Sequence, residues 1–480
     1  MSTDTPPAVA SATTTKMGRM GKMESMDSVP SELLTLAHTV VNRAQPGEGL
    51  EVYVTRGTDT EIRAYEGEVE SLTSADSSGV GIRVLVEGEA GTRVGFAWAG
   101  SLDPEVIGAT LADARDNARF ATPDHNVVLA RPDGVVATEL TLWDPSVTET
   151  PMERKVAMAV ELERATRAAD PRVRQVSSAD YSDSRVEVAL ASTTGISSYR
   201  RRTSASLSVD AIVGGADDTQ TGSGFTVGRG PDGLVPDDAT ADAVLRATRM
   251  LGATKARSAH CTVVFDPRVV STLLGVISSA LSGEAVVKGR SFFAARLGES
   301  VAAPALTLVD DPTDPRAYGA ASHDGEGLAC RRNVLIEDGV LKMFVYDTVS
   351  ARRAGTVSTG SAVRGGFAGM PGAGCRALVL TPGTAGADEV LASVGQGLYV
   401  QSVTGIHSGV NPVSGDFSVG AEGLMIRGGV LAEPVREITV ASTLQRMLQS
   451  VVAIGADLRW LPGTAAGQTL AIADMALSGE

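Results

Sequence analysis

One short stretch of the sequence, HDGEGLAC at 323–330, brings together three kinds of side chain that can bind a metal ion. It supplies His323, Asp324, Glu326 and Cys330. Imidazole, thiolate and carboxylate groups are the usual zinc ligands, but this spacing matches none of the recurrent zinc motifs. The two interleaved glycines are typical of a turn, so we expect a surface loop before a hairpin rather than a metal site.

Nucleophilic catalysis has little support elsewhere in the chain. Five histidines are present, and none lies near a serine in the strand–turn–helix context of a nucleophile elbow. The three cysteines, Cys261, Cys330 and Cys375, form neither a disulfide framework nor a pair spaced for metal binding. We interpret them as small buried apolar side chains in a reducing compartment.

Glycine is frequent in a second stretch, GIHSGVNPVSGDFSVGAEGLMIRGG at 405–429. A phosphate-binding loop needs a compact glycine pattern that leads into a helix, but these glycines are irregularly spaced and a hairpin follows. Val413, Phe417 and Val419 alternate with polar residues, which predicts a half-buried strand. Glycines in a strand allow another backbone to approach, so an exposed edge here could accept an extended peptide; ordinary bulges and turns are the alternative.

Charge and hydropathy argue against two classes of protein. The 480 residues carry a formal net charge of −15, whereas a nucleic-acid-binding surface is basic. No run of 18 apolar residues is present, so we expect no membrane span. The first 30 residues lack the apolar core of a secretory signal, and we therefore expect a cytoplasmic protein.

Arg200, Arg201 and Arg202 form the single basic cluster, within a segment that has the pattern of a strand. Consecutive residues of a strand point to opposite faces, so the three side chains cannot share one face. We interpret the cluster as a solvated or interface edge.

The elements that must position these residues follow an α+β pattern in two domains, after a disordered tail at 1–29. Between residues 30 and 235 a short helix precedes two copies of one pattern, an antiparallel meander followed by helix. This predicts a layered domain of sheet and helices. The Gly- and Asp-rich segment 216–236 is interpreted as a boundary or flexible loop.

The second domain, at 236–480, is predicted to be mostly antiparallel sheet with one prominent internal helix. Asp266 and Pro267 supply the N-cap and the first-turn proline of that helix. Two near copies, VLIEDGVLKMFV at 334–345 and LMIRGGVLAEPV at 424–435, each place a glycine between apolar runs. Both predict β-hairpins.

Several motifs of this second domain occur together in the order of one known family. SGDFSVGAEG at 414–423 precedes a hairpin and the strand PVREITV, and RNVLIEDGVLKMFVYDTVSARRAG at 332–355 combines a hairpin with a helix. VAIGADLRW lies near the end. These stretches resemble the TldD/PmbA family, and they are most similar to its PmbA (TldE) branch. The resemblance is clearest from about residue 260 to 460, and the N-terminal half fits it more loosely.

In this family the TldD-type subunit resembles a zinc peptidase, in which an H-E-x-x-x-H helix and a cysteine near the C-terminus bind the metal. The glutamate of that helix is the general base. The matching helix here, LLGVISSALSG at 273–283, has neither histidine nor carboxylate, and the C-terminal stretch has no cysteine. The histidine positions fall on Leu274 or Gly275 and on Ser279 or Ala280. The resemblance therefore implies a PmbA/TldE-type subunit that binds no metal or other cofactor itself.

The resemblance also implies a TldD-like H-E-x-x-x-H partner, which carries the zinc in a heterodimeric peptidase acting on unfolded or leader peptides. This chain is then a non-catalytic subunit that supplies cavity wall, partner interface and a peptide-binding strand. The peptide-binding or interface candidates in segment 405–420 are His407, Asn411, Ser414 and Asp416. Two alternatives stay open: a non-enzymatic peptide-binding or scaffold protein without a peptidase partner, and a stand-alone hydrolase that uses the histidine and cysteine of HDGEGLAC.

Overall fold

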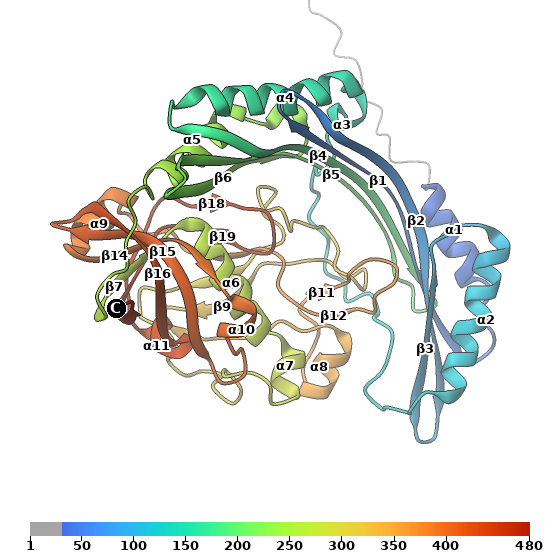
Figure 1. Ribbon diagram of the computed structural model, residues 1–480. Helices are drawn as coiled ribbons and strands as arrows, with labels where there is room; N and C mark the ends of the chain where they lie inside the picture. The colour runs from blue at the N-terminus through green and yellow to red at the C-terminus, as the bar shows by residue number, and fades with distance from the viewer. Residues whose placement is uncertain (1–30) are drawn as a thin grey trace, which may run out of the picture.

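The structure is a computed structural model that describes residues 31–480. The predicted tail at 1–29 lies outside the described residues. Helices and strands are mixed along the chain, which confirms the predicted α+β class (Figure 1). No helix within 31–480 is both long and apolar enough to cross a lipid bilayer.

Six long antiparallel strands form one curved sheet in the order β3-β2-β1-β4-β5-β6. Each half of this N-terminal sheet is a meander, and the halves join where β1 pairs with β4. The predicted repetition of the meander is confirmed, and it builds a single sheet. The strands are β1 Glu48–Tyr65, β2 Glu68–Gly88, β3 Gly91–Ala99, β4 Val173–Ser192, β5 Ser197–Gly215 and β6 Asp218–Gly228.

Four helices cover the convex side of this sheet, which arches over the C-terminal half (Figure 1). Their apolar sides pack on alternate residues of the strands, α1 and α2 over one half of the sheet and α4 and α5 over the other. The helices are α1 Glu32–Val41, α2 Pro104–Phe120, α4 Met152–Ala169 and α5 Pro236–Thr248.

The loop predicted at 216–236 is wrong, because β6 occupies most of this segment. Its glycines allow α5 to approach closely: a Cβ on Gly222 would lie 2.3 Å from the Ala243 carbonyl oxygen, and one on Gly224 would lie 1.8 Å from that of Ala239. Since α5 packs on this sheet, the N-terminal layer continues beyond residue 235, where the domain boundary is predicted.

The C-terminal half is built on a sheet that closes on itself. Its strands follow the order β16-β15-β14-β7-β20-β17, and β16 also pairs with β20. Every neighbouring pair is antiparallel except β7 with β14, in agreement with the predicted sheet. The strands are β7 Ala259–Phe265, β14 Gln396–Thr404, β15 Asp416–Arg427, β16 Val430–Thr443, β17 Val451–Ile454 and β20 Leu470–Ser478.

Most of the remaining elements are short and belong to the C-terminal half, whereas α3 contacts β4 and β5 of the N-terminal sheet. One further sheet has the order β10-β9-β8-β13, and β11–β12 and β18–β19 form separate pairs. The strands are β8 Leu308–Asp310, β9 Asn333–Glu337, β10 Val340–Leu341, β11 Ala362–Val363, β12 Gly372–Ala373, β13 Leu378–Leu380, β18 Arg459–Trp460 and β19 Ala466–Gly467. The helices are α3 Ser146–Glu149, α6 Pro267–Ala280, α7 Gly283–Val287, α8 Thr348–Ala354, α9 Ala387–Val394, α10 Ile406–Gly409 and α11 Leu444–Gln449.

Both predicted hairpins are present, β9 with β10 and β15 with β16. Each has a two-residue turn in which both residues have positive φ, 48° and 79° at Asp338 and Gly339, and 59° and 83° at Gly428 and Gly429. This backbone matches the twist of the strands and favours glycine, which explains why the two sequences are near copies.

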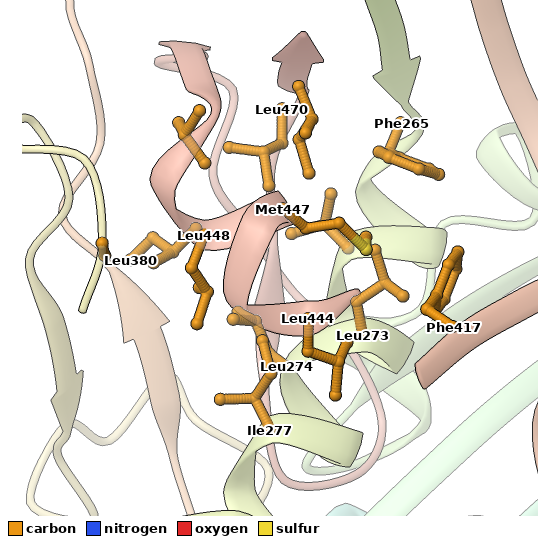
Figure 2. Close-up of a cluster of buried hydrophobic side chains, with 14 of the residues drawn as sticks. Phe265, Leu273, Leu274, Ile277, Leu380, Phe417, Leu444, Met447, Leu448 and Leu470 are labelled. Atoms are coloured by element: carbon orange, nitrogen blue, oxygen red, sulfur yellow. The ribbon is translucent and has the colours of Figure 1, made fainter. Parts of the chain in front are cut away.

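The predicted internal helix is α6, and it begins as its sequence indicates. Asp266 Oδ1 accepts a hydrogen bond from the Arg268 backbone N–H at 2.9 Å, and Pro267 occupies the first turn. One side of α6 is buried in the C-terminal core against α11 and neighbouring strands (Figure 2). The labelled α6 residues in that cluster are Leu273, Leu274 and Ile277.

Candidate functional site

Helix α6 matches the metal-binding helix of the resembled family, but its side chains do not suit a metal ion. Of the four histidine-equivalent positions, Leu274 and Ala280 are buried, with exposed fractions of 3% and 0%. Gly275 has open space where a side chain would lie, and the exposed Ser279 donates from Oγ to the Val276 carbonyl at 2.7 Å. These apolar and hydroxyl groups offer none of the imidazole or thiolate donors that zinc requires.

The rest of the described chain offers no substitute for these ligands. Within residues 31–480, no group of three or more His, Cys, Asp or Glu side chains is arranged so that it could hold a metal ion. The side chains of α6 therefore do not fit the zinc ion that the resemblance assigns to the TldD-type subunit.

The HDGEGLAC turn is buried, so the predicted surface loop is wrong. Asp324 and Glu326 each have an exposed fraction of 0%. Asp324 accepts backbone hydrogen bonds from Glu326 at 2.8 Å and from Ala362 at 3.0 Å, which satisfies its carboxylate inside the protein. The glycine pattern reflects close packing: Gly327 has φ +81°, and a Cβ there would lie 2.4 Å from Ile196 Cγ2 of the N-terminal half.

Burial also makes the titratable groups of this turn poor catalysts. Desolvation and then the neighbouring Asp324 raise the pKa of Glu326 to about 8. Desolvation raises the pKa of Cys330 to about 12, so its thiol is protonated at neutral pH, whereas the thiolate is the nucleophile and metal ligand. Burial, together with Arg200, lowers the pKa of His323. These environments argue against the stand-alone hydrolase.

The glycine-rich stretch does not present a free strand edge, so that prediction is wrong. β15 pairs with β14 on one side and with β16 on the other, so a peptide cannot add to it. Val413, which the alternating pattern places in the strand, lies in a turn and is 47% exposed. Glycine lets neighbouring backbones approach: a Cβ on Gly423 would lie 1.8 Å from the Tyr399 carbonyl oxygen. The alternative of bulges and turns is confirmed.

The four polar candidates of this stretch are exposed around one loop, and three of them maintain its shape. Asn411 Oδ1 accepts from the Val413 backbone N–H at 2.9 Å, and Ser414 Oγ donates to Asp416 Oδ2 at 2.6 Å. His407 lies on α10 at the start of the loop. Their exposure suits contact with a peptide or partner, and that role stays a prediction.

The three consecutive arginines lie on the part of β5 that extends beyond β6, which gives this interior strand a local edge of the predicted kind. β5 pairs with β4 along this stretch, whereas its pairing with β6 begins only at Ala205. Arg200 and Arg202 lie on one face of the sheet. Arg201 points to the other face, where its guanidinium lies 5.0 Å from the centre of the Trp143 ring.

A cavity of about 730 Å³ opens at this edge of β5. Two further arginines reach it from the C-terminal half, and aromatic side chains contribute to its wall. None of the described residues that line it is an aspartate or a glutamate. We call it the arginine cavity, after Arg200, Arg201, Arg202, Arg364 and Arg376.

Arg200 connects the arginine cavity to the buried turn behind it. Its Nη1 donates to the carbonyl oxygens of His323 and Asp324 at 3.4 and 3.1 Å, and its Nη2 donates to Tyr53 Oη at 3.1 Å. These acceptors are uncharged, and within residues 31–480 Arg200 forms no direct salt bridge with a carboxylate. Desolvation and then neighbouring arginines lower the pKa of Arg202 to about 10, which still leaves it protonated at neutral pH.

Arg364, in contrast, has a counter-charge. It forms an ion pair with Glu51, and its guanidinium lies 4.8 Å from the centre of the Tyr53 ring. Glu51 also accepts from Arg83 Nη1 at 3.3 Å, and the three charged side chains are at most 2% exposed. Although burial raises the pKa of Glu51, the two guanidinium groups outweigh it and lower that pKa overall. The carboxylate of Glu51 thus pairs with both Arg83 and Arg364.

The sequence pattern located the basic cluster at an edge but gave no sign of this cavity. Arg364 and Arg376 are far from β5 in sequence and reach it only through the packing of the two halves. The one available signal is the cluster itself, three consecutive arginines in a chain whose net charge is −15.

Comparison with known proteins finds three family models in chain order. They are PmbA/TldA metallopeptidase domain 1 at 50–118, the central domain at 145–251 and the C-terminal domain at 258–479. Metalloprotease PmbA of Escherichia coli is 27% identical over 436 residues, covering 90% of this chain and 93% of that protein. A metalloprotease TldD homolog of Haemophilus influenzae is 28% identical over 393 residues, which cover 78% of each protein.

Among solved structures, TldE from Thermococcus kodakarensis matches with a TM-score of 0.82 at 22% identity. The match covers 93% of this chain and 99% of that one, so the two share the same fold over nearly their whole length.

Proposed function

The chain belongs to the PmbA/TldD metallopeptidase family, and we propose that it acts there as a TldE-like, non-catalytic subunit. In this proposal a TldD-like chain supplies the H-E-x-x-x-H helix and the zinc ion. The two chains together hydrolyse unfolded or leader peptides. The relatives named as metalloproteases support the reaction class.

The composition and packing of α6 carry this proposal. Zinc-assisted hydrolysis of an amide requires ligands that leave one coordination position open and a base that removes a proton from water. From Pro267 to Ala280 the helix has no histidine, cysteine or carboxylate. Leu274 and Ile277 instead pack in the core beside Met447, which supports a structural role for this helix (Figure 2).

We assign the partner or peptide contact within segment 405–420 to the exposed loop that carries His407, Asn411, Ser414 and Asp416. The loop is joined to β15, a strand paired on both sides, which gives it a rigid base. In this proposal, the side chains of the loop contact the peptide or the partner. A peptide cannot add to β15 as an extra strand, because β15 is already paired on both sides.

Co-expression tests the association. This chain, carrying an affinity tag, is produced together with a TldD-like H-E-x-x-x-H chain, and the purified material is examined by native mass spectrometry and zinc analysis. We expect a complex containing both chains, with zinc that is lost when both histidines of the partner's helix are replaced by alanine. Recovery of this chain without the partner would favour the scaffold alternative, and stoichiometric zinc in this chain alone would revive the stand-alone hydrolase.

A further inference from the structure

The charge of the arginine cavity is unusual for this molecule. The chain has a net charge of −15, yet five arginines and no carboxylate line this one cavity, within the residues described. A second, larger cavity of about 1040 Å³ shows the contrast, because Glu48, Glu87 and Asp133 lie there among its arginines. The excess of positive charge is therefore a local property of the arginine cavity.

Two of the arginines also carry buried nitrogen atoms that no acceptor among the described residues satisfies. Arg364 Nη1 and Arg376 Nε are buried nitrogen atoms with no hydrogen-bond partner among the described residues. A buried donor without an acceptor costs free energy, and a carboxylate is an acceptor that guanidinium groups bind in a bidentate, charge-assisted geometry. Behind the cavity, burial and then Asp324 raise the pKa of Glu326 to about 8, so this carboxyl group compensates little of the charge at neutral pH.

Part of the backbone beside the arginines is also available for pairing. Between Ser197 and Ser204, β5 pairs with β4 on one side, and β6 is absent from the other because its pairing begins at Ala205. In this stretch the Thr203 N–H is bound by the Leu142 carbonyl at 2.9 Å. Residues of both faces of β5, from Tyr199 to Ser204, line the cavity, which shows that the cavity follows the strand edge.

We propose that the arginine cavity binds an extended peptide segment rich in aspartate and glutamate, which lies along the free edge of β5. The edge provides main-chain hydrogen bonds to the peptide, and the arginines select its carboxylates. A free edge is a feature that a peptide can use and a phosphate ion cannot. The inference deepens the proposed function, on which it rests, by naming an acidic segment of the peptide substrate.

Binding by the full chain alone tests this inference without any need for a peptidase partner. The probe is a fluorescein-labelled octapeptide of alternating Glu and Val, compared by fluorescence anisotropy with its Gln/Val analogue. We expect the Glu peptide to bind at least about tenfold more tightly, and its affinity to fall as salt is added. Methylation of the backbone nitrogens at alternate residues of the Glu peptide is expected to weaken its binding, because it removes donors of main-chain hydrogen bonds to β5.

Arg202→Gln is the informative variant, because Arg202 lies in the cavity and has no counter-charge. We expect it to weaken binding of the Glu peptide by about tenfold, the loss typical of one charge-assisted contact. Arg257→Gln is the matched control: Arg257 is exposed and lies outside the cavity, so this variant should bind as the unmodified chain does. Thermal unfolding of both variants verifies that they fold.

Three outcomes would overturn the inference. These are equal binding of the Glu and Gln peptides, unchanged binding by Arg202→Gln, and displacement of the Glu peptide by tripolyphosphate at lower concentration than by free Glu peptide. The last result would identify a phosphate site instead. Failure of the co-expression experiment with retained peptide binding would disprove the proposed partner and leave the acidic-peptide site in place.

Discussion

Helix α6 and the first residues of β5 differ in the chemistry that their side chains allow. At α6, the positions where the family carries metal ligands are leucine, glycine, serine and alanine, and the helix is fixed in an apolar core. At β5, consecutive arginines border a cavity with more positive charge than its surroundings neutralise. The contrast is between a helix whose side chains pack in the core and a strand segment whose side chains are suited to binding, which is the arrangement that the proposed function requires.

The largest loss of stability is expected when the carboxylate that neutralises an arginine of the cavity is removed. Glu51→Ala leaves Arg83 and Arg364 buried without their shared carboxylate, which should lower the free energy of unfolding by about 4 kcal/mol. Equilibrium unfolding in urea measures the change. Arg202→Gln is the matched comparison and should change stability by less than about 1 kcal/mol, because Arg202 has no carboxylate partner to lose. Similar losses in both variants would remove the distinction between compensated and uncompensated arginines.

The second test asks whether α6 serves the core. Leu274→Ala should lower the free energy of unfolding by about 3 kcal/mol, through lost burial and the cavity left beside α11. Ser279→Ala, one turn further on the exposed side, should change it by less than about 0.5 kcal/mol. The same urea experiment compares them. If Leu274→Ala lowers the free energy of unfolding by less than about 1 kcal/mol, this side of α6 is not packed in the core.

The third test concerns the carboxyl groups behind the arginine cavity. Burial and then Asp324 raise the pKa of Glu326 from 4.5 to about 8, so the folded protein binds a proton there that the unfolded chain releases between these values. The stabilising contribution is present below about pH 4.5 and is lost as pH rises toward 8. Glu326→Gln mimics the protonated form, so its stability relative to the unmodified chain should rise across this window by up to about 1.4 kcal/mol per pH unit. A constant difference from pH 5 to 8 would show that Glu326 is ionised throughout.

The smallest effect is expected at the loop of the 405–420 segment. His407 is exposed, so His407→Ala should leave stability unchanged within about 0.5 kcal/mol. If the loop contacts the partner, affinity for the TldD-like chain should fall several-fold, measured by surface plasmon resonance. Lys342→Ala, which changes an exposed residue that follows β10, is the control. Equal affinity of both variants would exclude His407 from the interface.

Local sequence signals predicted the elements that depend on near neighbours. The two hairpins follow from glycines that their turns require at positive φ, and the start of α6 follows from Asp266 and Pro267. The alternating patterns of the N-terminal half likewise predicted both meanders. In each case the physical cause lies within a few residues of the signal.

Signals whose cause is distant in sequence were misread. The glycines of β6 and β15 suggested loops or a free edge, but they exist because α5 and β14 approach closely from elsewhere in the chain. The HDGEGLAC turn is buried by the N-terminal half, and the arginine cavity needs Arg364 and Arg376 beside β5. Composition does not record such contacts between separate segments.

The most direct test of the central claim is peptide hydrolysis by separated and recombined subunits. An unfolded reporter peptide is incubated with zinc and this chain alone, the TldD-like chain alone, or both, with and without a chelator. The account predicts no cleavage by this chain alone and chelator-sensitive cleavage by the mixture, lost when the partner's H-E-x-x-x-H glutamate is replaced by glutamine. Chelator-sensitive cleavage by this chain in isolation would contradict it.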